Sequence, residues 1–465
     1  MWYLLYNIGL ILASPVIFLM LWAKKRCRRG FAQRLGLRRG GPGRGNRPVL
    51  WVHAVSLGEV VGVAPLVRAL VASRPGYRII VSTVTETGRE AVEQKLAGVA
   101  EHRYAPLDFP WVVSRAVLDV NPAAFLFVET ELWPNLLRAL GRRGVVAILV
   151  NGRLSSHSFR GYRIVRSFMK QVLQNVTLCL TQSQRDAQRF IALGASPASV
   201  HITGNIKFDQ PLPDPGGTTR SAIGLEDHED LIVAGSTHPG EEEELLSCYE
   251  VLRREWSSLV LLLAPRHIER AGDLEAVVRA RGLPAVRRSA LRQKGQAVAE
   301  VGAGGARVPV ASAGATGDGP PSATMGARVV ILDTRGELAG IYRHAALSFV
   351  GGTLVPVGGH NLLEPALYGT PVFFGPYTDH CVETADLLLR AGGGARVRNG
   401  ADLAEQMAAR LRDRPALHRM GQAARAMVLE NQGALGRSLD QIAKIFDTHG
   451  LRPGPVVSRI QNADS

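Results

Sequence analysis

Cysteine is scarce in this chain, and its spacing excludes a structural zinc site. The 465 residues contain four cysteines, Cys27, Cys179, Cys248 and Cys381, and none of them belongs to a closely spaced pair. We expect them to be reduced thiols in a cytoplasmic setting. A repeat of solenoid period is also missing. These absences leave a globular chain with no metal framework, and its length predicts two domains.

Acidic residues are absent from the first 47 positions, which hold ten basic residues. The net charge of the whole chain is +15, so this short stretch supplies ten of those charges. Residues 1–23 carry no charge and are long enough to cross a bilayer as a helix. Aromatic side chains lie near both ends of this segment, as is typical of membrane interfaces. The sequence therefore predicts a membrane anchor over 1–23 and a basic juxtamembrane arm over 24–47.

The order of apolar and basic segments favours an intact anchor over a signal peptide, whose charges would come first and whose cleavage site would follow. A positive segment after the anchor places the following domains in the cytoplasm, at the inner membrane, against anionic lipid headgroups. A monotopic insertion, with Pro15 bending the segment, is the alternative. Nucleic-acid binding is disfavoured because the basic arm lacks interleaved aromatic residues.

Short apolar runs separated by helix-length segments indicate parallel sheets covered by helices on both faces. The runs fall in two sets, which predicts two domains of similar α/β type: 48–52, 79–82, 124–128, 145–150, 179–181 and 200–203 in the first, then 231–234, 259–263, 329–332, 347–350 and 372–374 in the second.

The predicted boundaries follow from composition. The first domain covers 48–212, and a proline- and glycine-rich linker leads to a second domain over 213–446, followed by a tail over 447–465. A stretch rich in glycine, alanine and serine, 286–328, is interpreted as a mobile surface insertion outside the functional site.

Polar side chains follow the apolar runs directly, where ligands bind in open α/β sheets. Glu59 follows the first run and suits either a general base or a helix N-terminal charge. Glu129 and Glu131 bracket a threonine after the third run, and one acid is enough to cap a helix. Lys207 is a cation that suits neutralising a leaving phosphate, although a solvated lysine remains possible.

Asn151 and Arg153 follow another run, at 145–150. They suit contacts to sugar hydroxyls or to a phosphate, and a plain turn remains the alternative.

The second domain carries turns that suit an anionic ligand. The most informative is the glycine-rich stretch 351–359, which follows one strand and runs into His360, Asn361 and an early-helix acid, Glu364. A carboxylate such as that of Glu364 accepts hydrogen bonds from two vicinal ribose hydroxyls. Further candidates are Ser236 and Thr237, which offer small hydroxyls, Arg266, which suits bidentate phosphate binding, and Gly336, Glu337 and Leu338, which open a helix.

Seven ordered segments together resemble the 3-deoxy-D-manno-octulosonic acid (Kdo) transferases of lipopolysaccharide assembly. They are HAVSLGEV, ETELWPNLL, NGRLS, GNIKFD, GSTHPGEEE, APRHIER and FVGGTLVPVGGHNLLEPALYGTPV, and they span residues 51–376. The resemblance implies a GT-B fold of two Rossmann-like domains facing a cleft, behind an N-terminal membrane-anchor helix. It also implies inverting, metal-independent transfer of Kdo from CMP-Kdo to the lipid A precursor, lipid IVA.

Residue roles follow from the resemblance by position. Glu59 matches the family's proposed general base, and Lys207 with one of Glu129 and Glu131 matches residues that stabilise the transition state. The donor-binding segments matched are Pro265-Arg266, Gly336-Glu337-Leu338 and Asn361-Leu362-Leu363-Glu364, which join Ser236, Thr237, Gly351 and Gly352 as the predicted CMP side. The insertion at 286–328 departs from the compact form of the family.

Two other functions remain open from the sequence. The first is another GT-B enzyme that uses a UDP-sugar, either a glycosyltransferase or an epimerase. The second is a membrane-anchored nucleotide sensor without catalysis. Donor choice separates the first from Kdo transfer, and the effect of replacing Glu59 separates the second.

Overall fold

The computed structural model describes residues 1–23, 29–37, 47–210, 218–291 and 328–451. The predicted linker at 211–217, most of the predicted insertion and the end of the predicted tail lie outside this range. The chain divides into two compact units, one formed by residues 1–210 and 431–465 and the other by residues 211–430. The predicted pair of α/β domains is confirmed, and we describe each unit by itself.

The first unit is built on a seven-stranded parallel sheet in the order β3-β2-β1-β4-β5-β6-β7. Both faces are covered, because Leu50 and Val52 of β1 pack into one hydrophobic cluster and Val49 and Trp51 pack into another. The chain moves outward from β1 to β3 along one side of the sheet, then returns to β4 and moves outward along the other side. This change of direction makes the carboxyl ends of β1 and β4 the topological switch point. The strands are β1 (Val49–His53), β2 (Arg78–Thr83), β3 (Glu101–Tyr104), β4 (Pro122–Val128), β5 (Val146–Gly152), β6 (Leu178–Thr181) and β7 (Val200–Ile202).

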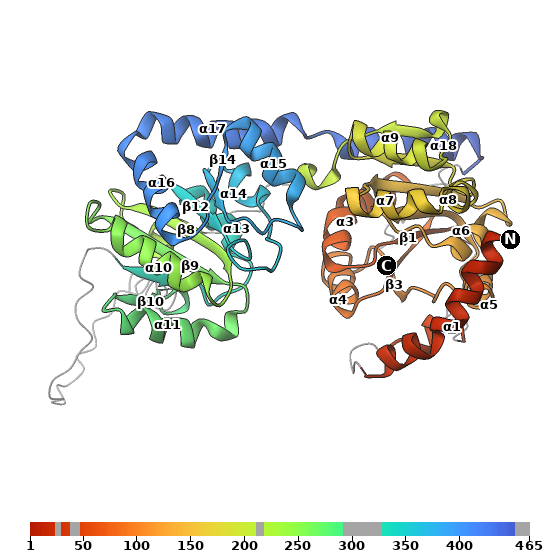
Figure 1. Cartoon of the computed structure of the whole chain (residues 1–465), viewed down its shortest axis with the longest axis horizontal. Coiled ribbons are helices and arrows are strands. Elements are labelled where there is room, and N and C mark those ends of the chain that lie inside the picture. The colour runs from red at the N-terminus through yellow and green to blue at the C-terminus, as the bar shows by residue number, and fades with distance from the viewer. Residues whose placement is uncertain (24–28, 38–46, 211–217, 292–327, 452–465) are drawn as a thin grey trace, which may run out of the picture. The chain divides into compact units, whose positions relative to one another are not determined.

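Helices connect these strands and cover both faces of the sheet (Figure 1). They are α3 (Leu57–Ser73), α4 (Glu86–Lys95), α5 (Pro110–Val120), α6 (Pro134–Gly141), α7 (Ser156–Ile164), α8 (Arg166–Leu173) and α9 (Gln184–Leu193), with the short α2 (Phe31–Arg34) before β1.

The second unit repeats this architecture with the strand order β10-β11-β9-β8-β12-β13-β14. Its switch point lies between β8 and β12. The strands are β8 (Asp230–Thr237), β9 (Leu259–Pro265), β10 (Ala285–Arg287), β11 (Val329–Ile331), β12 (Leu347–Val350), β13 (Val372–Phe374) and β14 (Gly394–Arg396). The helices are α10 (Glu241–Leu252), α11 (Ala271–Ala280), α13 (Leu338–Ile341), α14 (Leu363–Leu367), α15 (Val382–Ala391), α16 (Gly400–Arg412) and α17 (Arg414–Glu430).

The C-terminal helix α18 (Ala434–Thr448) corrects the predicted boundary at residue 446. It belongs to the first unit, and its blue ribbon lies among the orange and yellow elements of that unit (Figure 1). Ile442 and Phe446 are buried in the cluster that contains Leu50. Asp209 accepts hydrogen bonds from the N–H groups of Gly433 and Leu435, at 2.5 and 2.6 Å. The chain therefore returns to complete the core of its first unit.

Replacing Phe446 by alanine is expected to destabilise the first unit by about 3–5 kcal/mol, because its fully buried ring would leave a cavity. Urea unfolding followed by tryptophan fluorescence measures this effect, since five of the six tryptophans, all except Trp256, lie in the first unit. Lys444→Ala, on the exposed side of the same helix, is the control and should change little. Equal stability of the Phe446 variant and the wild type would contradict the assignment of α18.

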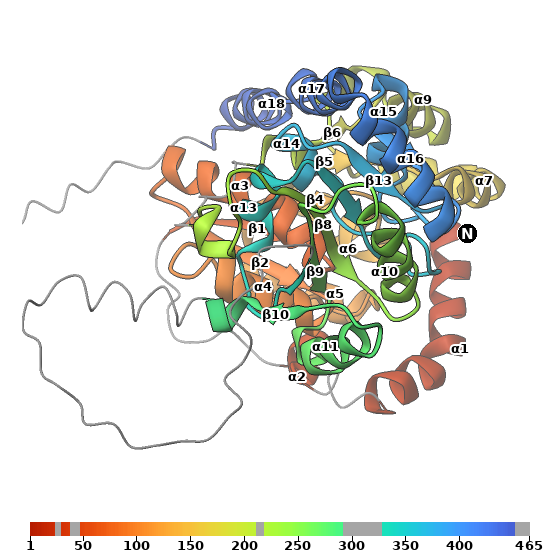
Figure 2. The ribbon, with the colours of Figure 1, turned by 90° about the vertical axis from the view of Figure 1, so that its left-hand side faces the viewer.

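The N-terminal helix α1 (Trp2–Ala23) packs against the first unit through its first two turns. Trp2, Tyr3 and Tyr6 surround the ring of Phe168, with ring centroids 5.2–6.4 Å away. The Tyr6 hydroxyl donates to Asp108 at 2.9 Å. Both views show α1 bending part-way along its length (Figures 1 and 2), as Pro15 inside the helix explains.

No helix in the described part of the chain combines the length and hydropathy needed to cross a bilayer. The transmembrane helix predicted over 1–23 is therefore not supported.

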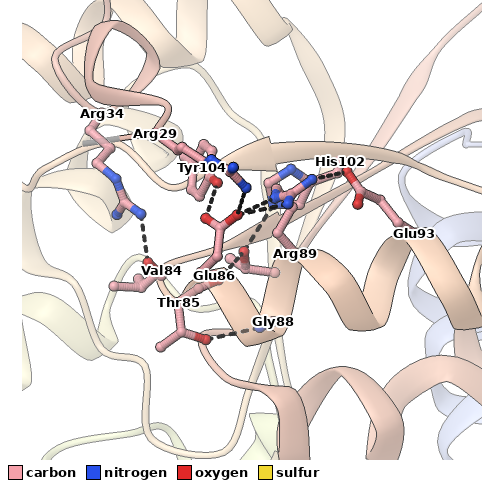
Figure 3. A network of polar contacts seen from close by, with 11 residues as sticks. Arg29, Arg34, Val84, Thr85, Glu86, Gly88, Arg89, Glu93, His102 and Tyr104 are labelled. Carbon is pink, nitrogen blue, oxygen red and sulfur yellow. Dashed lines mark hydrogen bonds and ion pairs between the residues drawn. The ribbon is translucent and has the colours of Figure 1, made fainter. Parts of the chain in front are cut away.

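Part of the predicted basic arm is folded onto the sheet (Figure 3). Arg34 is 2 % exposed, donates to the carbonyl of Val84 at 2.7 Å and lies 4.4 Å over the Tyr104 ring. Glu86 accepts from Arg29 at 3.2 Å and from the Tyr104 hydroxyl at 2.5 Å. Burial is the largest influence on the pKa of Glu86 and raises it. The bonds from Tyr104, Arg89 and Arg29 together outweigh burial and hold this pKa below its usual value. Arg34 is thus a structural cation that cannot reach lipid headgroups.

Candidate active site

Glu59 lies in the first turn of α3, directly after β1 at the switch point of the first sheet. Its carboxylate accepts from the Val55 N–H at 2.8 Å and from the Ser56 hydroxyl at 3.0 Å, so it also holds the start of the helix. Burial, together with the charges of Glu131 and Glu129, raises its pKa to about 7 despite these hydrogen bonds. A carboxylate with this pKa can accept a proton near neutral pH.

Glu129 follows β4, the neighbour of β1, and has a left-handed backbone with φ 57°. That conformation is unusual for a residue other than glycine and is often found at functional sites. Its Oε1 atom lies 2.7 Å from the Nζ atom of Lys207. The structure therefore joins two of the predicted catalytic residues as an ion pair.

Glu131 completes the acidic group. Its Oε2 atom accepts from the indole N–H of Trp133 at 2.8 Å. Burial and the charge of Glu129 raise its pKa, while the bond from Trp133 opposes the shift. The four predicted catalytic residues, Glu59, Glu129, Glu131 and Lys207, are thus brought together at the carboxyl ends of β1 and β4.

Lys207 is held in place by residues for which the sequence did not indicate this supporting role. The side chain of Asn151 accepts from the Ile206 N–H at 3.1 Å, and that of Asn205 accepts from the Lys207 N–H at 3.0 Å. A Cβ atom on Gly62 would lie 3.3 Å from the Lys207 side chain, so this glycine lets the lysine stem pass α3 closely. Asn151 is 1 % exposed and supports the lysine turn, which does not fit the sugar-hydroxyl contact considered for it.

In the second unit, Ser236 and Thr237 end β8 at the switch point. Ser236 has a left-handed backbone with φ 57°. Thr237 is fully buried, and its hydroxyl donates to Glu242 at 2.9 Å, while Arg270 makes a bidentate pair with the same carboxylate at 3.0 and 2.7 Å. The Thr237 hydroxyl therefore has a structural role, and its assignment to donor binding is not what this geometry favours.

Arg266 follows β9 and is exposed, with its N–H bonded to the Thr237 carbonyl at 2.9 Å. Beside it lies a histidine pair that the sequence did not reveal as a pair. The Nε2 atoms of His238 and His360 are 2.8 Å apart, and the rings stack with centroids 5.1 Å apart. Burial, reinforced by the charges of His238 and Arg266, lowers the pKa of His360 to about 4. In this corner of the second unit, Arg266 is a cation that suits an anionic ligand, whereas the lowered pKa values of His238 and His360 favour neutral rings.

Gly336, Glu337 and Leu338 lie before and in the first turn of α13. Glu337 pairs with Arg288 at 3.1 Å and accepts from the Thr334 hydroxyl at 2.6 Å. Arg288 lies in the predicted insertion 286–328, whose first residues are therefore folded next to a predicted donor segment. Residues 286–291 are therefore not the mobile surface segment that was expected, and residues 292–327 lie outside the described residues. That the insertion lies outside the functional site stays a prediction.

In the glycine-rich loop after β12, the backbone N–H groups have other partners than the bound anion that the sequence predicted. A Cβ atom on Gly351 would lie 2.4 Å from the Ser236 carbonyl oxygen, so only glycine fits there. The Gly351 N–H donates to the Gly235 carbonyl, and the Gly352 N–H donates to Glu241 at 2.7 Å. These N–H groups were expected to face a bound anion, and the structure shows them occupied by the protein itself. Contact of Gly351 and Gly352 with the donor stays a prediction.

Asn361, Leu362, Leu363 and Glu364 form the start of α14. The Asn361 side chain accepts from the Leu363 N–H at 3.1 Å and donates to Glu364 at 3.2 Å. Burial raises the pKa of Glu364, and the bond from Asn361 opposes the shift. Leu362 and Leu363 are buried, so only the amide and the carboxylate present polar side-chain atoms here. The pair is suited to hydroxyl groups, which donate to a carboxylate and accept from an amide.

Known proteins with similar sequences identify the family of this chain. A family model described as "3-Deoxy-D-manno-octulosonic-acid transferase (kdotransferase)" matches residues 29–210. The 3-deoxy-D-manno-octulosonic acid transferase of Haemophilus influenzae is 32 % identical over 95 % of this chain and 98 % of its own length. This chain belongs to the Kdo transferase family. The Kdo transferase of Bordetella pertussis is 31 % identical, with 94 % of this chain and 98 % of that protein covered.

Among solved structures, the UDP-GlcNAc 2-epimerase of Neisseria meningitidis has a TM-score of 0.56, at 12 % identity over 85 % of this chain and 100 % of that one. This likeness shows the shared two-domain fold alone. As a Kdo transferase, the chain is a glycosyltransferase that transfers Kdo in lipopolysaccharide synthesis.

Proposed function

We propose that this Kdo transferase moves Kdo from CMP-Kdo to a hydroxyl of the lipid A precursor, lipid IVA, with inversion and with Glu59 as the general base. The gathering of Glu59, Glu129, Glu131 and Lys207 at one switch point, with the Glu59 pKa near 7, is the observation that supports this proposal most strongly. A base with a pKa near 7 can both accept a proton and release it near neutral pH.

These groups account for each proton and bond that changes in the reaction. The acceptor hydroxyl gives its proton to Glu59, its oxygen forms a bond to the anomeric carbon, and the bond from that carbon to the phosphate oxygen breaks. The sugar becomes oxocarbenium-like as the phosphate departs, and a carboxylate nearby stabilises that positive charge. Glu131, which accepts from the neutral indole of Trp133, suits this role better than Glu129, which is paired with the cation of Lys207. Lys207 neutralises the charge that grows on the phosphate.

The second unit is proposed to hold CMP-Kdo. Arg266 suits the phosphate, and Glu364 with Asn361 suits the ribose hydroxyls. Backbone groups at Gly336 and Leu338 remain candidates for the nucleotide. Because protein cations supply the charge neutralisation, we expect transfer without a metal ion.

Donor binding tests this proposal. Isothermal titration of the full chain with CMP should give heat of binding, and UDP should bind far more weakly. The alternative of a UDP-sugar glycosyltransferase or epimerase predicts the opposite preference. Transfer measured in EDTA should match transfer measured without it, and loss of activity that added Mg²⁺ restores would contradict metal independence.

Attachment to anionic inner-membrane lipids on the cytoplasmic side is proposed to use the outer face of α1. While Tyr3 and Tyr6 face the protein, large apolar side chains on the other face are exposed by 45–75 %: Leu4, Leu5, Ile8, Ile11, Leu12, Val16 and Leu19. Such a one-sided helix suits insertion parallel to the membrane surface. Basic residues in the 24–47 segment would lie near anionic headgroups, with buried Arg34 excepted.

Leu12→Glu is expected to weaken binding to vesicles that contain anionic phospholipid by about tenfold or more, since it removes a leucine from the inserted face and adds a charge. Flotation of the full chain with vesicles measures this. Leu429→Glu, at an exposed leucine of the second unit, is the matched control. Equal loss in both variants, or in neither, would contradict attachment through α1. Deleting 1–23 is a poorer test, because Tyr3 belongs to a hydrophobic core cluster.

A further inference from the structure

Glu241, the first residue of α10, is a fully buried carboxylate inside the predicted donor site. Its Oε2 atom accepts from the N–H groups of His238 at 3.0 Å and Gly352 at 2.7 Å. Its Oε1 atom accepts from the N–H groups of Thr353 at 2.9 Å and Leu354 at 2.8 Å. One side chain thus binds four backbone donors on two segments that lie more than a hundred positions apart.

These contacts explain how an acid is tolerated in a site for an anionic nucleotide. A buried carboxylate is costly unless hydrogen bonds satisfy it. Here three N–H groups of the glycine-rich loop and one of the turn after β8 do so, and the carboxylate also lies at the N-terminus of α10. The glycine-rich loop makes the anion cradle that its sequence predicts, but the anion in the cradle belongs to the protein. The loop is therefore held in shape by a carboxylate of the protein itself.

We propose that Glu241 is a positioning residue for the donor: it ties the turn after β8 to the glycine-rich loop after β12. The inference rests on the proposed donor site in the second unit. Glu241 makes no contact with the donor itself. It fixes the backbone of His238, whose Nε2 atom lies 2.8 Å from that of His360. It also holds the glycine-rich loop in the place where Gly351 packs against Ser236.

The geometry separates Glu241 from its neighbours in the same acidic run. Glu242 accepts from Thr237 and Arg270. Glu243 accepts from the Gly240 N–H, and Glu244 accepts from the Gly400 N–H. Only Glu241 among these four is bonded to the glycine-rich loop in the described structure. A motif of consecutive acids therefore contains one residue with a distinct task.

Glu241→Gln tests the inference in the full chain. The amide keeps the size of the side chain but places two donors against backbone donors, so at least part of the four-bond set is lost. We expect the Kd for CMP and the KM for CMP-Kdo to rise by about tenfold to a hundredfold. At saturating donor, kcat should stay within about threefold of wild type, because the catalytic groups are untouched.

Two controls make the result specific. Glu243→Gln changes the same charge on an exposed neighbour and should leave KM unchanged. Met407→Ala truncates a fully buried core side chain of the second unit, far from the loop in sequence, and reports what destabilisation alone does to KM. Unchanged CMP binding in Glu241→Gln, or an equal rise of KM in Met407→Ala, would overturn the inference. Failure of the wild type to bind CMP would instead overturn the proposed function.

Discussion

Replacing Glu59 by glutamine is expected to lower kcat for Kdo transfer by about 10³-fold, while the Kd for CMP stays close to that of the wild type. General-base catalysis contributes typically 10²–10⁴-fold, and glutamine cannot accept the proton of the acceptor hydroxyl. The amide oxygen of glutamine can still accept one of the bonds from Val55 and Ser56, so α3 should keep its start. Single-turnover transfer to lipid acceptor in detergent measures the effect.

Glu86→Gln is the matched control for Glu59, because Glu86 also lies in the first turn of a helix that follows a strand of the same sheet. Its partners are Arg29, Arg89 and Tyr104, so its replacement should lower stability without lowering kcat. Near-normal turnover in Glu59→Gln would remove Glu59 from the base role and would favour the interpretation that this carboxylate only holds the start of α3.

The pH dependence of the wild type follows from the same carboxylate. Only the ionised form of Glu59 is a base, and its pKa is raised to about 7, chiefly by burial. We therefore expect kcat/KM to fall roughly tenfold per pH unit below pH 7 and to level off above it. In Glu59→Gln, the residual activity should lack this inflection. A wild-type profile that is flat from pH 5 to 8 would contradict the assignment.

Replacing Lys207 by methionine is expected to lower kcat by about 10²–10³-fold, in the range found when an electrostatic stabiliser of a transition state is removed. Methionine keeps most of the apolar stem that packs at Gly62 but removes the charge. The change also leaves Glu129 without the ion pair at 2.7 Å. Transfer assayed at saturating CMP-Kdo isolates the effect on kcat from any effect on donor binding.

Lys207→Arg keeps a cation and is the control for charge. It should recover part of the lost rate, and the recovery should be incomplete because a guanidinium is bulkier than an ammonium beside α3. A Lys207→Met variant with wild-type kcat would show that the lysine only supports the fold. Equal losses in the arginine and methionine variants would show that position, and not charge, is what the reaction needs.

The central strands could be predicted from sequence because parallel strands covered on both faces are continuous apolar runs. Runs such as 124–128 and 259–263 fall inside β4 and β9. The strands that were missed, β3, β10 and β14, each lie at or near a sheet edge and are mostly not buried. Edge strands need few apolar residues, so β3 reads Glu-His-Arg-Tyr and leaves no pattern.

The domain boundary could not be predicted, because α18 has the same amphipathic pattern as any surface helix. Whether Phe446 packs on one unit or the other is decided by tertiary contacts with residues hundreds of positions earlier, such as Asp209 and Arg74. The same limit applies to α1. Its composition predicts contact with lipid, but only the fold shows that Tyr3 and Tyr6 face the protein.

The candidate site was predictable in outline, since polar residues after strands at a switch point converge. Glu59, Glu129, Glu131 and Lys207 are together for this reason. The partners of buried polar groups were not predictable. Nothing in the run Glu241-Glu242-Glu243 indicates which acid binds the glycine-rich loop, because the answer depends on helix rotation within one turn. The loop showed the chemistry of an anion site, and only the structure showed which anion occupies it.

The most direct test of the account is mass spectrometry of lipid IVA after incubation with the enzyme and CMP-Kdo. We expect the lipid to gain the mass of Kdo and the nucleotide to appear as CMP at similar rates in wild type and Glu243→Gln, and about 10³-fold more slowly in Glu59→Gln. The same spectrum counts how many Kdo units are added. Unchanged lipid with wild-type enzyme, or Kdo transfer by Glu59→Gln at the wild-type rate, would contradict the central claim that Glu59 activates the acceptor hydroxyl.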